Sequence, residues 1–136
     1  MTTEYNKPLP VTNDVTAPFW EAAKRHEMML QRCKQCGHRF MYPREMCPNC
    51  MAFDLEWVKV AGKGRLYSFG VTRQPAHPSF NDVVPFIFAL VQLDEGPRII
   101  TNLVDCAIED AYVEMPVEVT YDDVTPEFTL VKFKPA

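Results

Sequence analysis

Alternating apolar and polar residues fill the second half of the chain and predict β-strands. In RLYSFGVTR (65–73) this alternation places Tyr67, Phe69 and Val71 on one face. The stretch PFIFALVQL (85–93) is apolar at nearly every position, which is typical of a strand covered on both faces. Three further strands are expected at 98–104, at 117–123 with Val117, Val119 and Tyr121 facing inward, and at 128–134.

The order of these five strands favours an OB-fold barrel. A predicted helical turn at 105–112 separates the third strand from the fourth, as in OB-folds, and closure would remove the exposed sheet edges. Gly62 and Gly64 precede the first barrel strand and predict a bend or bulge. The longest loop, 74–84, joins the first two strands, where OB-folds often bind ligands.

Near the N-terminus, a 3.6-residue periodicity predicts one helix over residues 17–29. Thr16 is a plausible N-cap, and Pro18 is tolerated in the first turn. Phe19 and Trp20 share one face of this helix. Two large aromatic side chains need cover, which either the chain's own core or a partner subunit could provide. We therefore consider Phe19 and Trp20 candidates for a partner interface.

Four cysteines form two Cys-x-x-Cys pairs, Cys33 with Cys36 and Cys47 with Cys50. Such spacing suits a tetrahedral four-thiolate zinc site, which has no open coordination position and so stabilises the fold rather than doing chemistry. Iron, as in rubredoxin, and two disulfides are the alternatives. Cys106 stands apart and is interpreted as a small, half-buried apolar residue.

Together these patterns predict a mainly β protein with an N-terminal helix, a rubredoxin-like zinc ribbon and a C-terminal five-stranded OB-fold barrel. The expected divisions are an extended arm at 1–15, the helix and ribbon at 16–54, and the OB-fold domain at 55–136. One structural Zn²⁺ per chain is expected at the four cysteines.

Charge is unevenly distributed in this chain of 136 residues with a net charge of −4. Residues 20–46 hold six Lys/Arg against three Asp/Glu, whereas residues 58–136 hold seven against eleven. An acidic barrel argues against a nucleic-acid partner, because such binding draws on basic grooves. The sequence shows neither a signal-peptide pattern nor an apolar run of membrane-spanning length, so we expect a cytoplasmic protein without a membrane partner.

The combination of motifs resembles the DUF35 family. The resemblance rests on an ordered series of stretches: PFWEAAKRHEMMLQRCKQCGHRFMYPREMCPNC, VKVAGKGRLYSFGVTRQ, PFIFALVQLDEGPRIITNLV and MPVEVTYDD. It implies a small, non-catalytic companion subunit of a thiolase-like enzyme that makes or breaks a carbon–carbon bond beside a CoA thioester. Such a subunit bridges or stabilises the catalytic subunit and helps to shape the acyl-CoA channel. The resemblance assigns metal binding to Cys33, Cys36, Cys47 and Cys50 and assigns no catalytic residue.

Coenzyme A carries phosphates, so cationic side chains beside an apolar groove are the natural candidates for its contacts. The predicted set is Lys24, Arg25, Arg32, Lys34, Arg73 and His77, with Arg39 and Arg44 also near the ribbon. Two other functions stay open: a nucleic-acid-binding zinc ribbon and OB module, and a stand-alone acyl-CoA thioesterase or transferase. The second would need a nucleophile with a base within reach.

Overall fold

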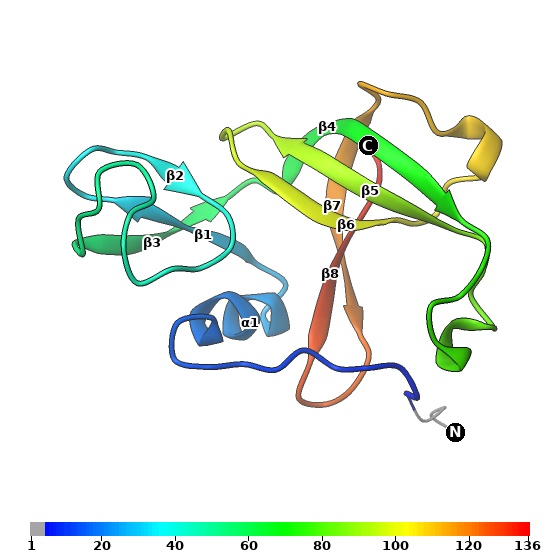
Figure 1. The fold of residues 1–136 in the computed structure, drawn as a ribbon. Helices are drawn as coiled ribbons and strands as arrows, with labels where there is room; N and C mark the ends of the chain where they lie inside the picture. The colour runs from blue at the N-terminus through cyan, green and yellow to red at the C-terminus, as the bar shows by residue number, and fades with distance from the viewer. Residues whose placement is uncertain (1–4) are drawn as a thin grey trace.

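The computed structural model describes residues 5–136 and consists of a small three-stranded sheet beside a closed five-stranded barrel (Figure 1). The order is β2-β1-β3 in the small sheet and β4-β5-β6-β8-β7 in the barrel. Helix α1 lies beneath the junction of the two, and residues 5–16 pass the start of β8 before they lead into α1 (Figure 1). The predicted mainly β architecture, with a ribbon and an OB-type barrel, is confirmed.

Helix α1 (Ala17–Lys24) is shorter than the predicted helix. The structure confirms its beginning, although the Thr16 side chain makes no capping hydrogen bond to the helix. The prediction that it extends to residue 29 was wrong. His26 has φ 59°, so the chain turns there, and β1 begins at Met28. Met28 is instead buried together with residues of the small sheet and the barrel. Such tertiary packing routinely overrides local helical propensity.

The small sheet is built on β1 (Met28–Cys33), which pairs with β2 (Arg39–Phe40) on one side and β3 (Leu55–Val60) on the other. β3 pairs with β1 over its whole length, from Cys33–Leu55 to Met28–Val60. The expected division after residue 54 therefore assigns to the barrel a strand that pairs in the ribbon sheet. Because β3 leads directly into β4, sequence order alone did not reveal which sheet it joins.

The barrel contains the five predicted strands in the predicted order. They are β4 (Lys63–Thr72), β5 (Phe86–Leu93), β6 (Arg98–Leu103), β7 (Pro116–Asp123) and β8 (Thr129–Pro135). Short 3₁₀ turns lie at Pro78–Phe80 (η1) and Ile108–Asp110 (η2), the latter between β6 and β7 as expected. The seam between β6 and β8 is narrow, with a single parallel pair, Leu103 with Phe133.

A bulge in β4 changes which of its side chains face the core. The register with β5 shifts between Leu66 and Ser68, so the residue between them leaves the alternation. Leu66 is fully buried, whereas Tyr67 is 42% exposed and carries the Arg98 guanidinium 3.8 Å above its ring. The prediction that Tyr67 shares a face with Phe69 was therefore wrong. After the bulge, Phe69 packs against the core.

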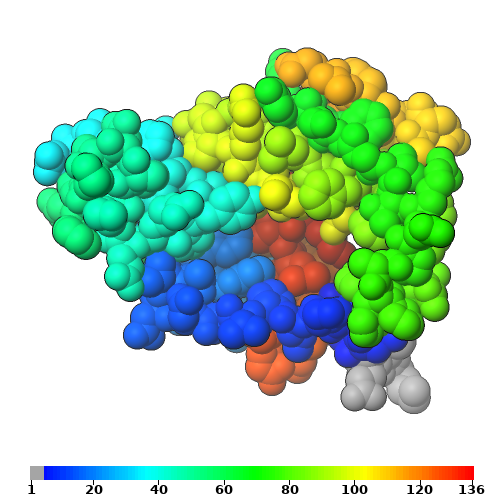
Figure 2. All heavy atoms as spheres, viewed as in Figure 1, coloured from blue at the N-terminus to red at the C-terminus, as the bar shows by residue number. Residues whose placement is uncertain are grey.

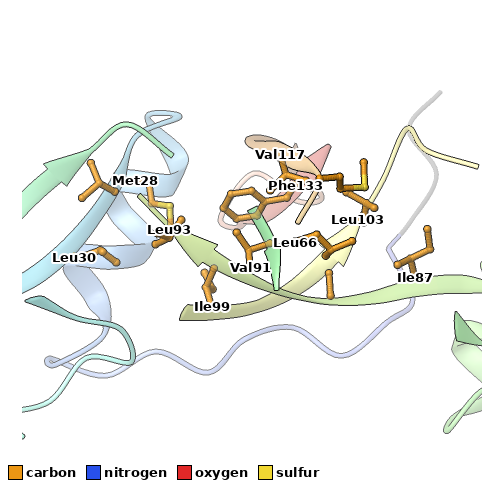
Figure 3. Packing of buried hydrophobic residues seen from close by; sticks show 13 residues of the cluster. Met28, Leu30, Leu66, Ile87, Val91, Leu93, Ile99, Leu103, Val117 and Phe133 are labelled. Carbon is orange, nitrogen blue, oxygen red and sulfur yellow. The ribbon is translucent and has the colours of Figure 1, made fainter. Parts of the chain in front are cut away.

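One continuous hydrophobic core joins the ribbon to the barrel (Figure 3). It contains Met28 and Leu30 from β1 as well as barrel residues such as Leu66, Val91 and Phe133. In Figure 3 the side chains extend from Leu30 and Met28 past Leu93 and Ile99 to the barrel centre at Phe133. The two parts therefore share buried surface, and each contributes to the stability of the other.

The predicted bend at Gly62 and Gly64 is confirmed and has a steric cause. Gly62 has φ +74°, and a Cβ there would lie 2.3 Å from Val119 Cγ1. At Gly64 a Cβ would lie 2.2 Å from the backbone oxygen of Gln92. The adjoining backbone N–H of Ala61 donates to Glu95 Oε2 at 3.1 Å, which ties this bend to the β5–β6 turn.

Candidate metal centre and the cleft beside it

The four cysteines of the two Cys-x-x-Cys pairs converge on one point. Their sulfur atoms all lie within 4.8 Å of one another, with Cys33 Sγ 3.6 Å from Cys50 Sγ and Cys36 Sγ 3.7 Å from Cys47 Sγ. A tetrahedral zinc with Zn–S bonds near 2.3 Å requires sulfur separations of about 3.8 Å. A disulfide would need about 2.05 Å, so the geometry fits a metal and not a pair of disulfides.

The two Cys-x-x-Cys segments form matching turns. Gly37 N–H donates to Cys33 O, and Met51 N–H donates to Cys47 O, both at 2.9 Å. In each turn the acceptor lies four residues before the donor. Both donor residues have positive φ, +78° at Gly37 and 64° at Met51. Cys33 comes at the end of β1, so the small sheet fixes the first turn relative to the second.

Without a cation, the surroundings lower the pKa of one cysteine and raise that of another. The Asn49 side chain and the His38 backbone lower the pKa of Cys36 to about 6. The Ala52 backbone N–H acts in the same direction on Cys50, but burial and three neighbouring sulfurs outweigh it and raise that pKa to about 12. Four thiolates this close repel one another, and a divalent cation removes that conflict.

Between the ribbon and the barrel lies a polar cleft of about 660 Å³. Arg32, His38 and Arg39 line it from the ribbon, and Glu95 and Arg98 from the β5–β6 turn and β6. Arg32 Nη1 donates to Glu56 Oε2 at 2.8 Å. Within residues 5–136 no ion pair engages the Arg39 guanidinium. The residues that line the cleft therefore carry a surplus of positive charge. Arg98, which comes from the barrel, was not among the predicted residues.

The structure does not bring the predicted CoA-binding residues together. Arg25 pairs with Glu27 at 3.0 Å, and Lys34 lies 3.8 Å from Asp54. Lys24 lines a separate small hollow beside Trp20. Arg73 and His77 lie in the loop between β4 and β5, and neither lines the ribbon–barrel cleft. Of the predicted set Arg32 lines the ribbon–barrel cleft, as does Arg39, one of the two further candidates near the ribbon.

The three histidines have structural contacts. His26 Nε2 lies 3.0 Å from an Asp123 oxygen, and its ring stacks on Tyr121. His77 Nδ1 accepts from Ser79 N–H at 3.1 Å and lies 2.7 Å from Ser79 Oγ, so this ring caps the 3₁₀ turn η1. His38 stacks on Phe40.

Cys106 is not activated for nucleophilic chemistry. Burial raises the pKa of its thiol, and the carboxylates of Asp110 and Glu109 add to that effect. A nucleophilic cysteine needs the opposite surroundings, with cations or a histidine that favour the thiolate. This agrees with the interpretation of Cys106 as a half-buried apolar residue.

The two helix aromatics differ in exposure. Phe19 is 6% exposed, and its ring meets that of Trp20 edge-on, with centroids 5.1 Å apart. Trp20 is half-buried and contacts Phe128 at a centroid distance of 6.2 Å. Phe19 thus packs within this chain, while part of Trp20 remains open beside an apolar hollow of about 440 Å³. Sequence reasoning missed Tyr42, Ile100 and Leu130, which line the same hollow.

Fold and metal site define a protein class: a four-cysteine zinc ribbon fused to an OB-type barrel. Two family models match consecutive parts of the chain, the "ChsH2, rubredoxin-like zinc ribbon domain" over residues 20–56 and the "ChsH2, C-terminal OB-fold domain" over residues 57–122. A DUF35 domain-containing scaffold protein of Methanocaldococcus jannaschii is 36% identical over 75% of this chain and 73% of its own length. The chain therefore belongs to the DUF35 family, and its four cysteines hold one structural zinc.

Other relatives are parts of enzyme assemblies. A probable enoyl-CoA hydratase alpha subunit of Thermomonospora curvata is 40% identical over 96% of this chain, and the chain spans only 40% of that protein's length. The benzoylsuccinyl-CoA thiolase subunit BbsA of Geobacter metallireducens is 32% identical over 68% of this chain and 65% of its own length. A chain of the solved structure "Ltp2-ChsH2(DUF35) aldolase" superposes with TM-score 0.84 at 39% identity, covering 93% of this chain and 98% of that chain.

Within the described part of the chain, no helix has the length and apolar character needed to cross a lipid bilayer.

Proposed function

We propose that this protein is a non-catalytic, zinc-containing subunit of a thiolase-type acyl-CoA complex that makes or breaks a carbon–carbon bond beside a CoA thioester. The observation that carries this proposal is the structural match over nearly the whole of both chains to a chain of the Ltp2-ChsH2(DUF35) aldolase. A thiolase subunit and a hydratase alpha subunit among the relatives support the same class of assembly.

The chemistry of the chain supports an accessory role. Four thiolates fill the coordination sphere of the zinc, so the metal has no position for substrate. His77 and Ser79 are in hydrogen-bond distance, but their contact belongs to the cap of a 3₁₀ turn and no carboxylate within residues 5–136 orients the ring. Catalytic groups would then come from the partner, while this subunit stabilises it and helps to shape the acyl-CoA channel.

For CoA itself, we propose the ribbon–barrel cleft as the place of contact. Arg32 and Arg39 face this cleft, and guanidinium groups suit phosphate oxygens because they can donate two hydrogen bonds at once. This choice narrows the predicted set, in which Lys24, Arg25, Lys34, Arg73 and His77 lie elsewhere. Calorimetry of the complex with CoA, comparing the wild type with Arg39→Ala, should show weaker binding in the variant; equal affinity would exclude this cleft.

The proposed function is tested by affinity purification of the tagged chain from its native cells, with mass spectrometry and zinc analysis. A thiolase-type protein in near-equal amount, together with about one zinc per chain, is the expected result. Recovery of the chain alone, or together with nucleic acid, would contradict the proposal and favour a binding module. Turnover of an acyl-CoA by the isolated chain, abolished by His77→Ala, would instead favour a stand-alone thioesterase or transferase.

A further inference from the structure

The outward-facing surface of β4, β5 and β6 is apolar at its centre and basic at one end. We name it the outer sheet face and define it by six residues: Arg65, Gly70, Phe88, Leu90, Arg98 and Ile100. The strand register places them in neighbouring cross-strand rows, with Gly70 opposite Phe88, Leu90 opposite Ile100, and Gln92 between Arg65 and Arg98. The residues that flank them along the chain are buried or half-buried.

The outer sheet face lacks the cover that the sequence of β5 leads one to expect. Ile87, Ala89 and Val91 are buried on the inner side of this strand. On the outer side, Phe88 is 47% exposed and Ile100 opposite Leu90 is 53% exposed. A strand that is apolar on both sides is typical of a sheet covered on both sides, and here one cover is missing from residues 5–136.

The face is also open beside Phe88. A Cβ added at Gly70 would meet no atom within 4 Å, so the space above that position is open. Ser68, another small residue, lies opposite Leu90 in the register. Small residues beside a large aromatic ring leave room for an apolar side chain of another protein to insert next to Phe88, as in the packed centres of protein interfaces.

Charge indicates what kind of surface would fit here. No ion pair among residues 5–136 involves Arg65 or Arg98: Arg65 donates to the backbone oxygen of Glu114, and Arg98 donates to the Gln92 side chain. None of the six residues is acidic, although the whole chain has a net charge of −4; Glu95, which lines the cleft with Arg98, accepts from the Ala61 backbone N–H. A complementary surface would therefore be apolar, with carboxylates opposite the two arginines.

The surroundings of the face extend the apolar surface toward the ribbon. Ile100 donates its backbone N–H to Tyr42 Oη, and both side chains line the hollow beside Trp20. Figure 2 shows residues of β5 and β6, in yellow-green and yellow, directly above a recess whose floor is formed by β8, in red. The outer sheet face and the exposed part of Trp20 thus border one continuous region.

We propose that the outer sheet face is the docking surface for the thiolase-type subunit, whose contacting surface is apolar and carries carboxylates opposite Arg65 and Arg98. This inference rests on the proposed function and states where on this chain the partner binds. A second copy of this chain would satisfy the pattern less well, because its own outer sheet face brings two more arginines and no carboxylate. Arg98 also lines the ribbon–barrel cleft, so the docked partner would border the proposed CoA contacts.

The test compares two double variants that remove similar exposed apolar surface from different places. Phe88→Ser with Ile100→Ser changes the outer sheet face. Tyr112→Ser with Val113→Ser is the matched control, since these residues are 58% and 54% exposed and follow η2. Binding is measured by calorimetry against the thiolase-type subunit recovered in the affinity purification. The outer-face variant should bind about 30-fold more weakly or worse, as for loss of a 2 kcal/mol contact, and the control within about threefold of wild type.

Folding and charge are checked separately. Zinc content and melting temperature show whether the outer-face variant is folded; if it is not, a photo-cross-linking benzoylphenylalanine at position 88 replaces it and should label the thiolase-type subunit. Arg98→Glu should weaken binding and reduce its salt dependence. Unchanged affinity of a folded outer-face variant, or no cross-link from position 88 within an intact complex, would overturn the inference alone.

Two other outcomes would also decide against it. A dimer of the isolated chain that the Phe88→Ser and Ile100→Ser changes dissociate, measured by light scattering, would assign the face to a second copy. Absence of any complex with wild-type protein would overturn the proposed function itself, and with it the inference. The wild-type measurement therefore separates the two failures.

Discussion

The backbone N–H of Ile100 donates a hydrogen bond to the phenol oxygen of Tyr42 at 2.9 Å, which joins the ribbon to strand β6 of the barrel. Tyr42 follows β2, and Ile100 lies in β6, at a part of that strand that β8 does not pair. The Tyr42 side chain thus supplies the acceptor that the backbone of a neighbouring strand would otherwise provide. The contact also adds a polar link to the apolar core that the ribbon and barrel share.

We expect Tyr42→Phe to lower the free energy of unfolding by about 1 kcal/mol, because the Ile100 N–H loses its acceptor while the aromatic packing stays. Amide hydrogen exchange at Ile100 should accelerate in the same variant. Tyr112→Phe, at an exposed tyrosine in the η2–β7 connection, is the control and should change neither quantity. Unaltered exchange at Ile100 in Tyr42→Phe would show that the bond does not persist in solution.

Cys33→Ser should abolish zinc binding and unfold the ribbon. Cys33 is fully buried at the end of β1, and zinc-binding energy in such a site is folding energy. Metal analysis and near-ultraviolet circular dichroism would measure both effects, and a strong chelator should reproduce them in the wild type. Cys106→Ser should retain one zinc per chain. A metal-free Cys33→Ser variant with wild-type stability would contradict the structural role of the metal.

Gly64→Ala should destabilise the protein by about 3 kcal/mol, at the upper end of the usual cost of overpacking. The added methyl group would approach the Gln92 backbone oxygen to 2.2 Å, and a backbone atom within the barrel cannot easily move away. Gly70→Ala is a matched control in the same strand, because its added methyl group meets open space. Urea denaturation distinguishes them; equal stability of the two variants would contradict the close approach of β4 and β5.

Phe19→Ala should lower the free energy of unfolding by about 3 kcal/mol, since the ring is buried and its removal leaves a cavity. Trp20→Ala should cost less stability, because Trp20 is only half-buried. The larger effect of Trp20→Ala is expected on affinity for the proposed thiolase-type partner. Thermal unfolding of both variants and calorimetry of the complex test this pair. A larger stability loss in Trp20→Ala than in Phe19→Ala would contradict the division of roles.

Local chemistry made the metal site predictable. Cys33, Cys36, Cys47 and Cys50 lie in two short turns, and a Cys-x-x-Cys turn brings its own two sulfurs together with little help from the rest of the chain. The strands of the barrel were predictable for a similar reason, since alternation of side chains along a strand has a period of two residues. The prediction that Tyr67 and Phe69 share a face failed because one extra residue, the bulge, shifts that alternation.

The cleft that we propose for CoA was less accessible to sequence reasoning. Cationic residues are common on protein surfaces, so their presence does not show where they meet. Arg32 and Arg39 reach the cleft because β1 and β2 pair, whereas Arg98 arrives from a barrel strand far along the chain. Arg25 and Lys34, which looked equivalent in the sequence, lie beside carboxylates instead.

The sequence by itself determined the four thiolate ligands, the five barrel strands and their order, because each depends on residues close together in the chain. Tertiary structure decided that α1 ends at Lys24, that β3 belongs to the ribbon sheet, and that the apolar outer side of β5 stays uncovered. These features depend on which distant segments compete to bury the same side chains. Which segments bury these side chains is decided only in the folded protein, where the ribbon and the barrel share one core.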